Sequence, residues 1–82
     1  MTGIIHRLVG YDRTTGRVVD EYDVPDDVLP QAKIIAHVPA DDPDAAMCYE
    51  LIPAQALDIA GFLQVSIDPV ARDYFLEGFT AE

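Results

Sequence analysis

The segment between residues 37 and 50 of this 82-residue chain contains a group of side chains that could bind a metal or take part in catalysis. It holds a histidine, the single cysteine and several carboxylates: His37, Asp41, Asp42, Asp44, Cys48 and Glu50. These groups are acceptable metal ligands, but the spacings typical of zinc and calcium sites do not occur. Pro43 also divides the acids, and the segment has no glycine to turn their side chains inward. We therefore expect a solvated turn and no metal.

Catalysis by the cysteine or by either histidine is disfavoured by the neighbouring residues. A nucleophilic thiol needs surroundings that lower its pKa, whereas Cys48 stands two residues from Glu50, a carboxylate that would raise it. His6 lies among apolar strand residues, and His37 is expected in the last turn of a helix, where a structural role suffices. No nucleophile elbow and no phosphate-binding glycine loop is present in the sequence. We expect no catalytic residue and no cofactor.

The charge of the chain restricts its partners. Fifteen acidic residues face five basic ones, which gives a formal net charge of -10. Direct binding to nucleic acid or to an anionic membrane is disfavoured, because phosphates are bound largely through lysine and arginine. The acidity suits a basic protein partner or mimicry of nucleic acid, but the acids are spread along the chain, which favours solubility alone.

The length and the hydrophobic content predict one domain that spans residues 1–82. Half of the residues are hydrophobic, so a core can form without the support of disulfides or a metal. A single cysteine excludes an internal disulfide. The N-terminal residues lack the basic and apolar regions of a secretory signal. We therefore expect a cytoplasmic location.

Two stretches near the N-terminus predict a β-hairpin. Residues 4–12 and 17–24 are rich in β-branched and aromatic side chains. Between them, Asp12 can accept hydrogen bonds from backbone amides ahead of it, and Gly16 can adopt a positive φ. The first stretch is apolar on both faces, which is typical of a central strand or of one that meets a partner.

Two further stretches predict helices, at 25–39 and 53–65. In the first, Asp26 or Asp27 is a natural N-cap, and Pro30 then falls in the first turn, where its missing amide costs nothing. The expected core-facing residues are Val28, Leu29, Ala32, Ile35 and Ala36 in the first helix, and Ala56, Ile59, Ala60 and Leu63, widened by Leu57 and Phe62, in the second. Gly61 within the second helix suggests close backbone packing at that point.

Strands are also expected at 45–51 and 73–79, so the predicted order is ββαβαβ. This order indicates an α+β fold with a mainly antiparallel four-stranded sheet and two helices packed on one face. One parallel crossover between the last two strands remains open. In the final strand, Phe75 and Phe79 share the side that the helices leave free. Either this side is covered by a partner, including a second copy of the chain, or Phe75 packs under a loop.

The stretches YDRTTGRVV, YELIPAQA and DYFLE together resemble a family of small bacterial domains of unknown function. The shared features are a T-G hairpin, a Y-E-L strand, a P-x-Q-A helix start and a D-Y-F-L-E terminal strand, and they span residues 4–79. The helix start departs from the pattern, because Ile52 stands where a capping threonine or serine is expected. The resemblance implies the fold and carries no activity.

We therefore expect a non-enzymatic module for protein–protein interaction. One concrete form is an immunity- or antitoxin-like inhibitor of a basic toxin, and another is a homodimer. The expected partner-binding residues are Asp20, Glu21, Asp23, Asp26, Asp27, Phe75 and Phe79. The alternative is a small-molecule binding or enzymatic domain that uses His6, Cys48 and Glu50, which would require these side chains to converge in a deep pocket.

Overall fold

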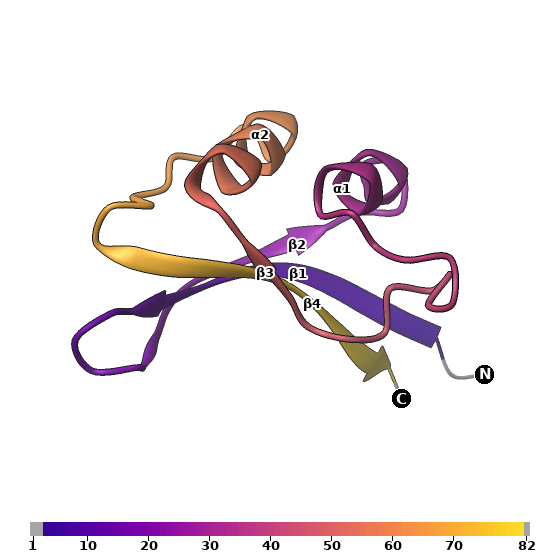
Figure 1. Cartoon of the computed structure of the whole chain (residues 1–82), viewed down its shortest axis with the longest axis horizontal. Coiled ribbons are helices and arrows are strands. Elements are labelled where there is room, and N and C mark those ends of the chain that lie inside the picture. Colours follow the sequence, from indigo (N-terminus) through magenta and orange to yellow (C-terminus); the bar gives the residue numbers. More distant parts are fainter. Residues whose placement is uncertain (1–2, 82) are drawn as a thin grey trace.

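The computed structural model describes residues 3–81, which form a four-stranded sheet with two helices on one of its faces (Figure 1). The elements in chain order are β1 (Gly3–Asp12), β2 (Val18–Val24), α1 (Leu29–Ile35), β3 (Tyr49–Leu51), α2 (Pro53–Leu63) and β4 (Arg72–Ala81). The strand order in the sheet is β2-β1-β4-β3, and each neighbouring pair is antiparallel. The predicted ββαβαβ order and α+β class are confirmed. The parallel crossover that the sequence left open does not occur, because β3 runs antiparallel to β4.

The hairpin between β1 and β2 forms as the sequence predicts. The Asp12 carboxylate accepts hydrogen bonds from the backbone N–H groups of Thr14 and Thr15, at 2.8 and 2.9 Å. Gly16 has a φ of 73°, a left-handed conformation that glycine adopts at little cost. β1 then lies between β2 and β4, which explains why it is apolar on both faces.

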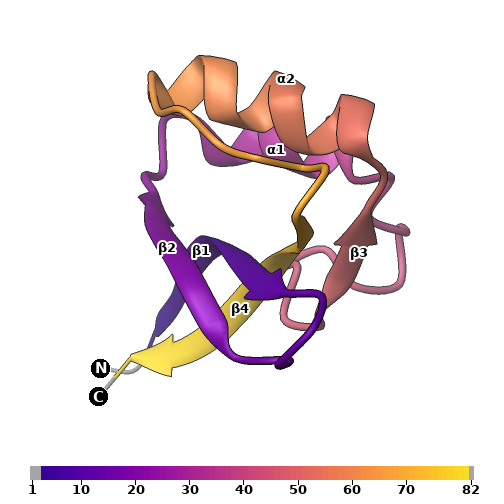
Figure 2. The same ribbon diagram turned by 90° about the vertical axis from the view of Figure 1, so that its left-hand side faces the viewer.

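The core lies between the sheet and the helices, both of which lie above the same face of the sheet (Figure 2). Its buried residues are Leu8, Val24, Leu51, Tyr74 and Leu76 from the strands, with Ala36, just after α1, and Ala32, Ala56, Ile59 and Ala60 from the helices. Most of the helical contribution is alanine, so the larger side chains of the core come mainly from the strands.

Helix α1 is shorter than predicted at its start. The N-cap position is Val28, and neither Asp26 nor Asp27 caps the helix. The backbone makes a turn first, in which the N–H groups of Val28 and Leu29 both donate to the carbonyl of Pro25, each at 3.0 Å. The two aspartates therefore lie exposed in the turn between β2 and α1.

Helix α1 also ends earlier than predicted. His37 follows the C-cap residue Ala36 and has a left-handed φ of 57°. Its N–H donates to the carbonyl of Ile34 and the N–H of Val38 donates to that of Lys33, a pattern that terminates helices. The prediction that His37 belongs to the last helical turn is wrong: α1 ends at Ile35, and His37 adopts its left-handed conformation just beyond the C-cap.

Helix α2 starts at Pro53, as predicted, and the side chain of Gln55 connects it to α1. The Gln55 Oε1 accepts the N–H of Ile52 at 2.9 Å, and its Nε2 donates to the carbonyl of Ile35 at 2.8 Å. The prediction for the width of the buried face is wrong, because Leu57 and Phe62 are each 51% exposed.

The expected close packing at Gly61 is also absent, since a Cβ added there would meet no atom of residues 3–81 within 4 Å outside its own helix. We therefore expect Gly61→Ala to raise the free energy of unfolding by about 0.5–1 kcal/mol, the difference between glycine and alanine inside a helix. Urea denaturation of the two proteins measures this change. A loss of stability would show that the helix packs at Gly61 after all.

Strand β3 begins four residues later than the predicted 45–51, because the chain before it is held in a turn. The Asp42 carboxylate accepts the backbone N–H groups of Ala46 and Met47, at 3.0 and 3.2 Å, and the hydroxyl of Tyr49. These bonds hold the pKa of Asp42 below its usual value, with the Tyr49 bond as the largest cause. The turn packs closely on β4, where a Cβ at Gly78 would lie 2.6 Å from the carbonyl oxygen of Ala45.

Candidate functional site

The candidate site is the side of the sheet that faces away from the helices, which we call the open face (Figure 1). Side chains alternate along strands, and the register brings alternate residues of all four strands to this side. The open face consists of Ile5, Arg7, Val9 and Tyr11 from β1, Glu21 and Asp23 from β2, Glu50 from β3, and Asp73, Phe75, Glu77 and Phe79 from β4.

Apolar and aromatic side chains occupy the middle strands of the open face. The rings of Tyr11 and Phe75 pack edge to face with their centroids 5.4 Å apart, and Val9 beside them is buried. Towards the other end of the same strands, Ile5 pairs with Phe79, and these side chains are 41% and 38% exposed. Ile5 and Phe79 therefore form a small exposed apolar area at this end of the open face.

A hydrogen bond between Tyr11 and Glu77 joins β1 to β4 on this face. The Tyr11 hydroxyl donates to the Glu77 carboxylate at 2.5 Å, and Glu77 is only 7% exposed. This bond, together with burial, raises the pKa of Tyr11 to about 12. The buried carboxylate is thus held by a neutral phenol, which stays protonated at neutral pH.

Arg7 connects the aromatic residues to the acids of β2. Its guanidinium forms ion pairs with Glu21 at 2.6 Å and with Asp23 at 3.1 Å. The same group lies 5.3 Å from the centre of the Phe79 ring, a cation–π distance. Exposed ion pairs contribute little to stability, so Arg7 acts mainly by fixing the positions of these side chains.

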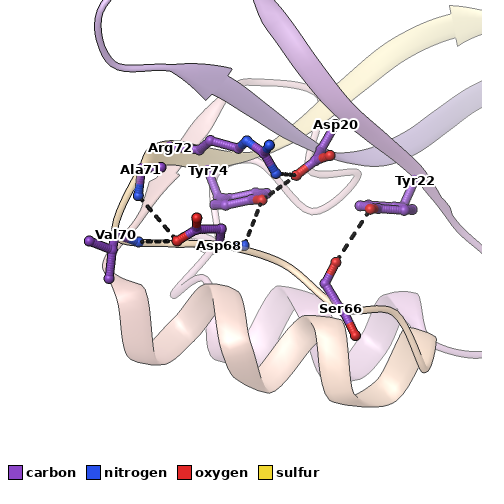
Figure 3. Close-up of polar contacts among 8 residues, drawn as sticks. All are labelled: Asp20, Tyr22, Ser66, Asp68, Val70, Ala71, Arg72 and Tyr74. Atoms are coloured by element: carbon purple, nitrogen blue, oxygen red, sulfur yellow. Dashed lines mark hydrogen bonds and ion pairs between the residues drawn. The ribbon is translucent and has the colours of Figure 1, made fainter.

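The structure brings four of the seven predicted partner-binding residues to the open face: Glu21, Asp23, Phe75 and Phe79. Asp26 and Asp27 lie exposed in the turn that follows β2. Asp20 lies on the opposite side, under the helices, where its carboxylate accepts hydrogen bonds from Arg72 at 2.9 Å and from the Tyr74 hydroxyl (Figure 3). The five acids therefore do not form one patch.

The alternative set of His6, Cys48 and Glu50 is divided between the two sides of the sheet. His6 is buried on the helix side, with its Nε2 at 2.8 Å from the carbonyl oxygen of Asp44. Glu50 pairs with Phe75 and belongs to the open face. Cys48 is exposed and lines a shallow hollow with Tyr11, and burial, followed by the charge of Glu77, raises the pKa of its thiol.

The acidic segment that precedes β3 forms a turn, with Asp42 as its organising residue. Within residues 3–81, no three histidine, cysteine or carboxylate side chains lie close enough to bind a metal ion together. Over the same residues, no helix has the length and apolarity needed to cross a bilayer.

Sequence reasoning singled out neither Arg7, Tyr11 nor Glu77, although these three residues organise the open face. The alternation along β1 already places Arg7 and Tyr11 on one side, and Glu77 lies between two phenylalanines on the same side of β4. The missing information was the strand register. It places Arg7 on β1 between Asp23 on β2 and Glu77 on β4.

The Tyr11–Glu77 bond predicts a loss of stability at alkaline pH. The pKa of Tyr11 is about 12 in the folded protein and about 10 in an unfolded chain. Its contribution is therefore complete below about pH 10 and is lost as the pH rises towards about 12. We expect Tyr11→Phe to remove this part of the pH dependence in urea unfolding measured across that range. Tyr22→Phe is the control, since the Tyr22 hydroxyl donates to a backbone carbonyl, that of Ser66, rather than to a carboxylate. Equal slopes for Tyr11→Phe and the unmodified protein would contradict the assignment.

The fold and the open face define a small α+β domain with an antiparallel sheet that is covered by helices on one side. The chain belongs to the family described as domain of unknown function (DUF7683), whose model matches residues 5–77. No curated protein and no solved structure matches the chain. Family membership therefore supports an unknown-function domain and assigns no activity.

Proposed function

We propose that this chain is a non-enzymatic interaction module that binds a partner protein through the open face. The observation that carries the proposal is the pair Ile5 and Phe79, both more than a third exposed, on a sheet face that no helix within residues 3–81 covers. Burying such a pair contributes a few kcal/mol, at about 25 cal/mol for each Å² of apolar surface removed from water.

The charges on the open face favour a basic partner. The carboxylates of Glu21, Asp23, Glu50, Asp73 and Glu77 stand against the guanidinium of Arg7, with Arg13 paired to Asp73 at the hairpin end. A second copy would bring the same excess of negative charge, and the whole chain carries -10. Like charges across an interface oppose association, so a heterologous basic protein is the preferred partner. An immunity- or antitoxin-like inhibitor of a basic toxin is one such arrangement.

The pKa shifts on the open face support binding over catalysis. A general base or nucleophile at neutral pH needs a pKa close to or below neutrality. Instead, hydrogen bonding and burial raise the pKa of Tyr11 to about 12, and burial raises that of Cys48. Both groups therefore stay protonated at neutral pH, and their contribution to the face is packing and hydrogen bonding.

Capture from the native cell tests the proposal if the bait is varied at defined positions. Phe79→Glu and Ile5→Glu each add a charge to the apolar part of the open face. Ile34→Glu is the matched control, because Ile34 is exposed on α1, on the helix side of the molecule. We expect a partner that is retained by the unmodified protein and by Ile34→Glu, but is lost with both open-face variants.

Salt and hydrodynamic measurements complete this test. The captured partner should carry a basic surface and should elute with increasing salt, since screening weakens exposed charge pairs. Capture that is unaffected by Phe79→Glu and Ile5→Glu would overturn the proposal. Sedimentation as a dimer that is abolished by Phe79→Glu would replace the basic partner with a second copy of the chain.

A further inference from the structure

The outer edge of β2 is a second surface with recognisable chemistry. β2 is an edge strand, and within residues 3–81 its backbone pairs with β1 alone. Its other edge therefore presents N–H and C=O groups to which a further strand can bind. Extended segments of partner proteins often bind in this way, with main-chain hydrogen bonds for affinity and alternate side chains for specificity.

A shallow, open groove of about 590 Å³ lies beside this edge. It is lined by Glu21, Tyr22, Asp23, Pro25, Asp27, Val28, Phe62, Leu63, Gln64 and Val65. On the helix side it is apolar, because Phe62 is exposed at the end of α2 and Leu63 and Val65 are only partly buried. Phe62, which the sequence pattern places in the core, instead contributes an exposed ring to this groove.

The acidic side chains that line this groove lie on one side of β2 and just beyond its end. Glu21 and Asp23 lie on the open-face side of β2, whereas Tyr22 points to the helix side. Asp27 contributes a further carboxylate at the end of the strand. Arg7 balances only part of this charge, since it is one cation shared between Glu21 and Asp23.

We infer that the β2 edge binds an extended segment of a partner in which basic residues alternate with apolar ones. An added strand would direct one set of side chains towards Glu21 and Asp23 and the other set towards Phe62 and Leu63. A second copy of β2 does not fit, because its own acids would face Glu21 and Asp23. This inference rests on one part of the proposed function, that the chain binds a basic partner protein, and it specifies the chemistry of that partner.

The test uses a capped peptide of alternating lysine and valine with the length of β2, which has seven residues. Its binding is followed by changes in the backbone amide signals of the isotope-labelled protein. We expect the largest changes at β2 and at residues 62–65. Two comparison peptides, one with glutamate for lysine and one with the lysines and valines in separate blocks, should bind at least about tenfold more weakly.

Variants of the protein locate the binding site. The double variant Glu21→Gln and Asp23→Asn removes the charges while retaining similar shapes, and Phe62→Ala removes the exposed ring. Each is expected to weaken peptide binding by about tenfold, equivalent to 1.4 kcal/mol. Asp58→Asn and Leu57→Ala are the matched controls, because both residues are exposed on α2 and do not line the groove. They should leave binding unchanged.

The outcomes separate this inference from the proposed function. Equal binding of the alternating and block peptides, or equal binding by the groove variants and their controls, would overturn the inference. Signal changes centred on Phe79 and lost with Phe79→Glu would place the peptide on the open face, which overturns the edge site and leaves the proposed function standing. Loss of peptide binding in the groove variants, with partner capture unaffected by Phe79→Glu and Ile5→Glu, would retain the edge site and reject the open face.

Discussion

Replacement of Gly10 by alanine is expected to lower the free energy of unfolding by about 1–3 kcal/mol, the usual cost of overpacking a core. A Cβ at this position would lie 2.6 Å from Cε1 of Tyr74 and 3.0 Å from its Cζ. The ring cannot easily move away, because Tyr74 is 1% exposed and its hydroxyl is bonded to Asp20 and to the N–H of Asp68 (Figure 3). Gly10 is therefore required by the tyrosine that lies across it.

Urea denaturation of Gly10→Ala, compared with Gly61→Ala, measures this effect. The two variants make the same chemical change, yet they should shift stability in opposite directions, since only Gly10 faces a side chain. Tyr74→Leu removes the ring, so Gly10→Ala should cost less stability in the Tyr74→Leu background than in the unmodified protein, and the two changes should be non-additive. Stability of Gly10→Ala equal to that of the unmodified protein would show that Tyr74 has room to shift.

Replacement of Asp20 by alanine is the second change with a large expected effect, a loss of about 1–3 kcal/mol. The Asp20 side chain is only 13% exposed, and it accepts hydrogen bonds from both Arg72 and Tyr74. Without it, the buried Tyr74 hydroxyl loses the acceptor for its proton, and Arg72 loses its ion pair. A buried donor that is left without a partner is more costly than the net value of the bond itself.

Thermal and urea denaturation of Asp20→Ala measure this loss, with two comparisons. Asp20→Asn keeps an oxygen acceptor and should lose less stability. Asp73→Ala removes an ion pair with Arg13 in which both side chains are about half exposed, so it should change stability little. If Asp20→Ala were no more damaging than Asp73→Ala, the cluster beneath the helices would not stabilise the fold.

The neighbouring acids Asp20 and Glu21 are expected to have different roles. Asp20 stands next to Glu21 in the sequence and was predicted to act with it at a partner surface. Because their side chains point to opposite sides of β2, Asp20→Ala should affect folding, while changes at Glu21 should affect binding.

Strand positions and strand faces were predictable because their signals are local. The alternation in β1 and the turn residues Asp12 and Gly16 fix the hairpin, and the apolar character of β1 on both sides correctly indicated a central strand. The same alternation correctly placed Phe75 and Phe79 away from the helices.

Features that depend on distant contacts were not predictable from these patterns. The start of β3 depends on the hydrogen bonds that Asp42 makes with the chain ahead of it. The need for glycine at position 10 depends on Tyr74, far along the sequence, whereas Gly61 in its helix has no such neighbour. The organisation of the open face by Arg7 depends on strand register, which a single sequence with weak turn signals does not define.

The central pair of strands has a consequence for the biosynthesis of the protein. β1 pairs with β4 along its whole length, from Gly3 with Ala81 to Asp12 with Arg72. These strands lie at opposite ends of the described chain, so the middle of the sheet cannot close until the segment 72–81 has left the ribosome. Until then, β1 exposes two apolar sides and can pair only with β2. The pairing of β1 with β4 joins segments far apart in the sequence, and non-local pairing of this kind slows folding. Chaperone dependence during translation should therefore be greatest just before β4 emerges.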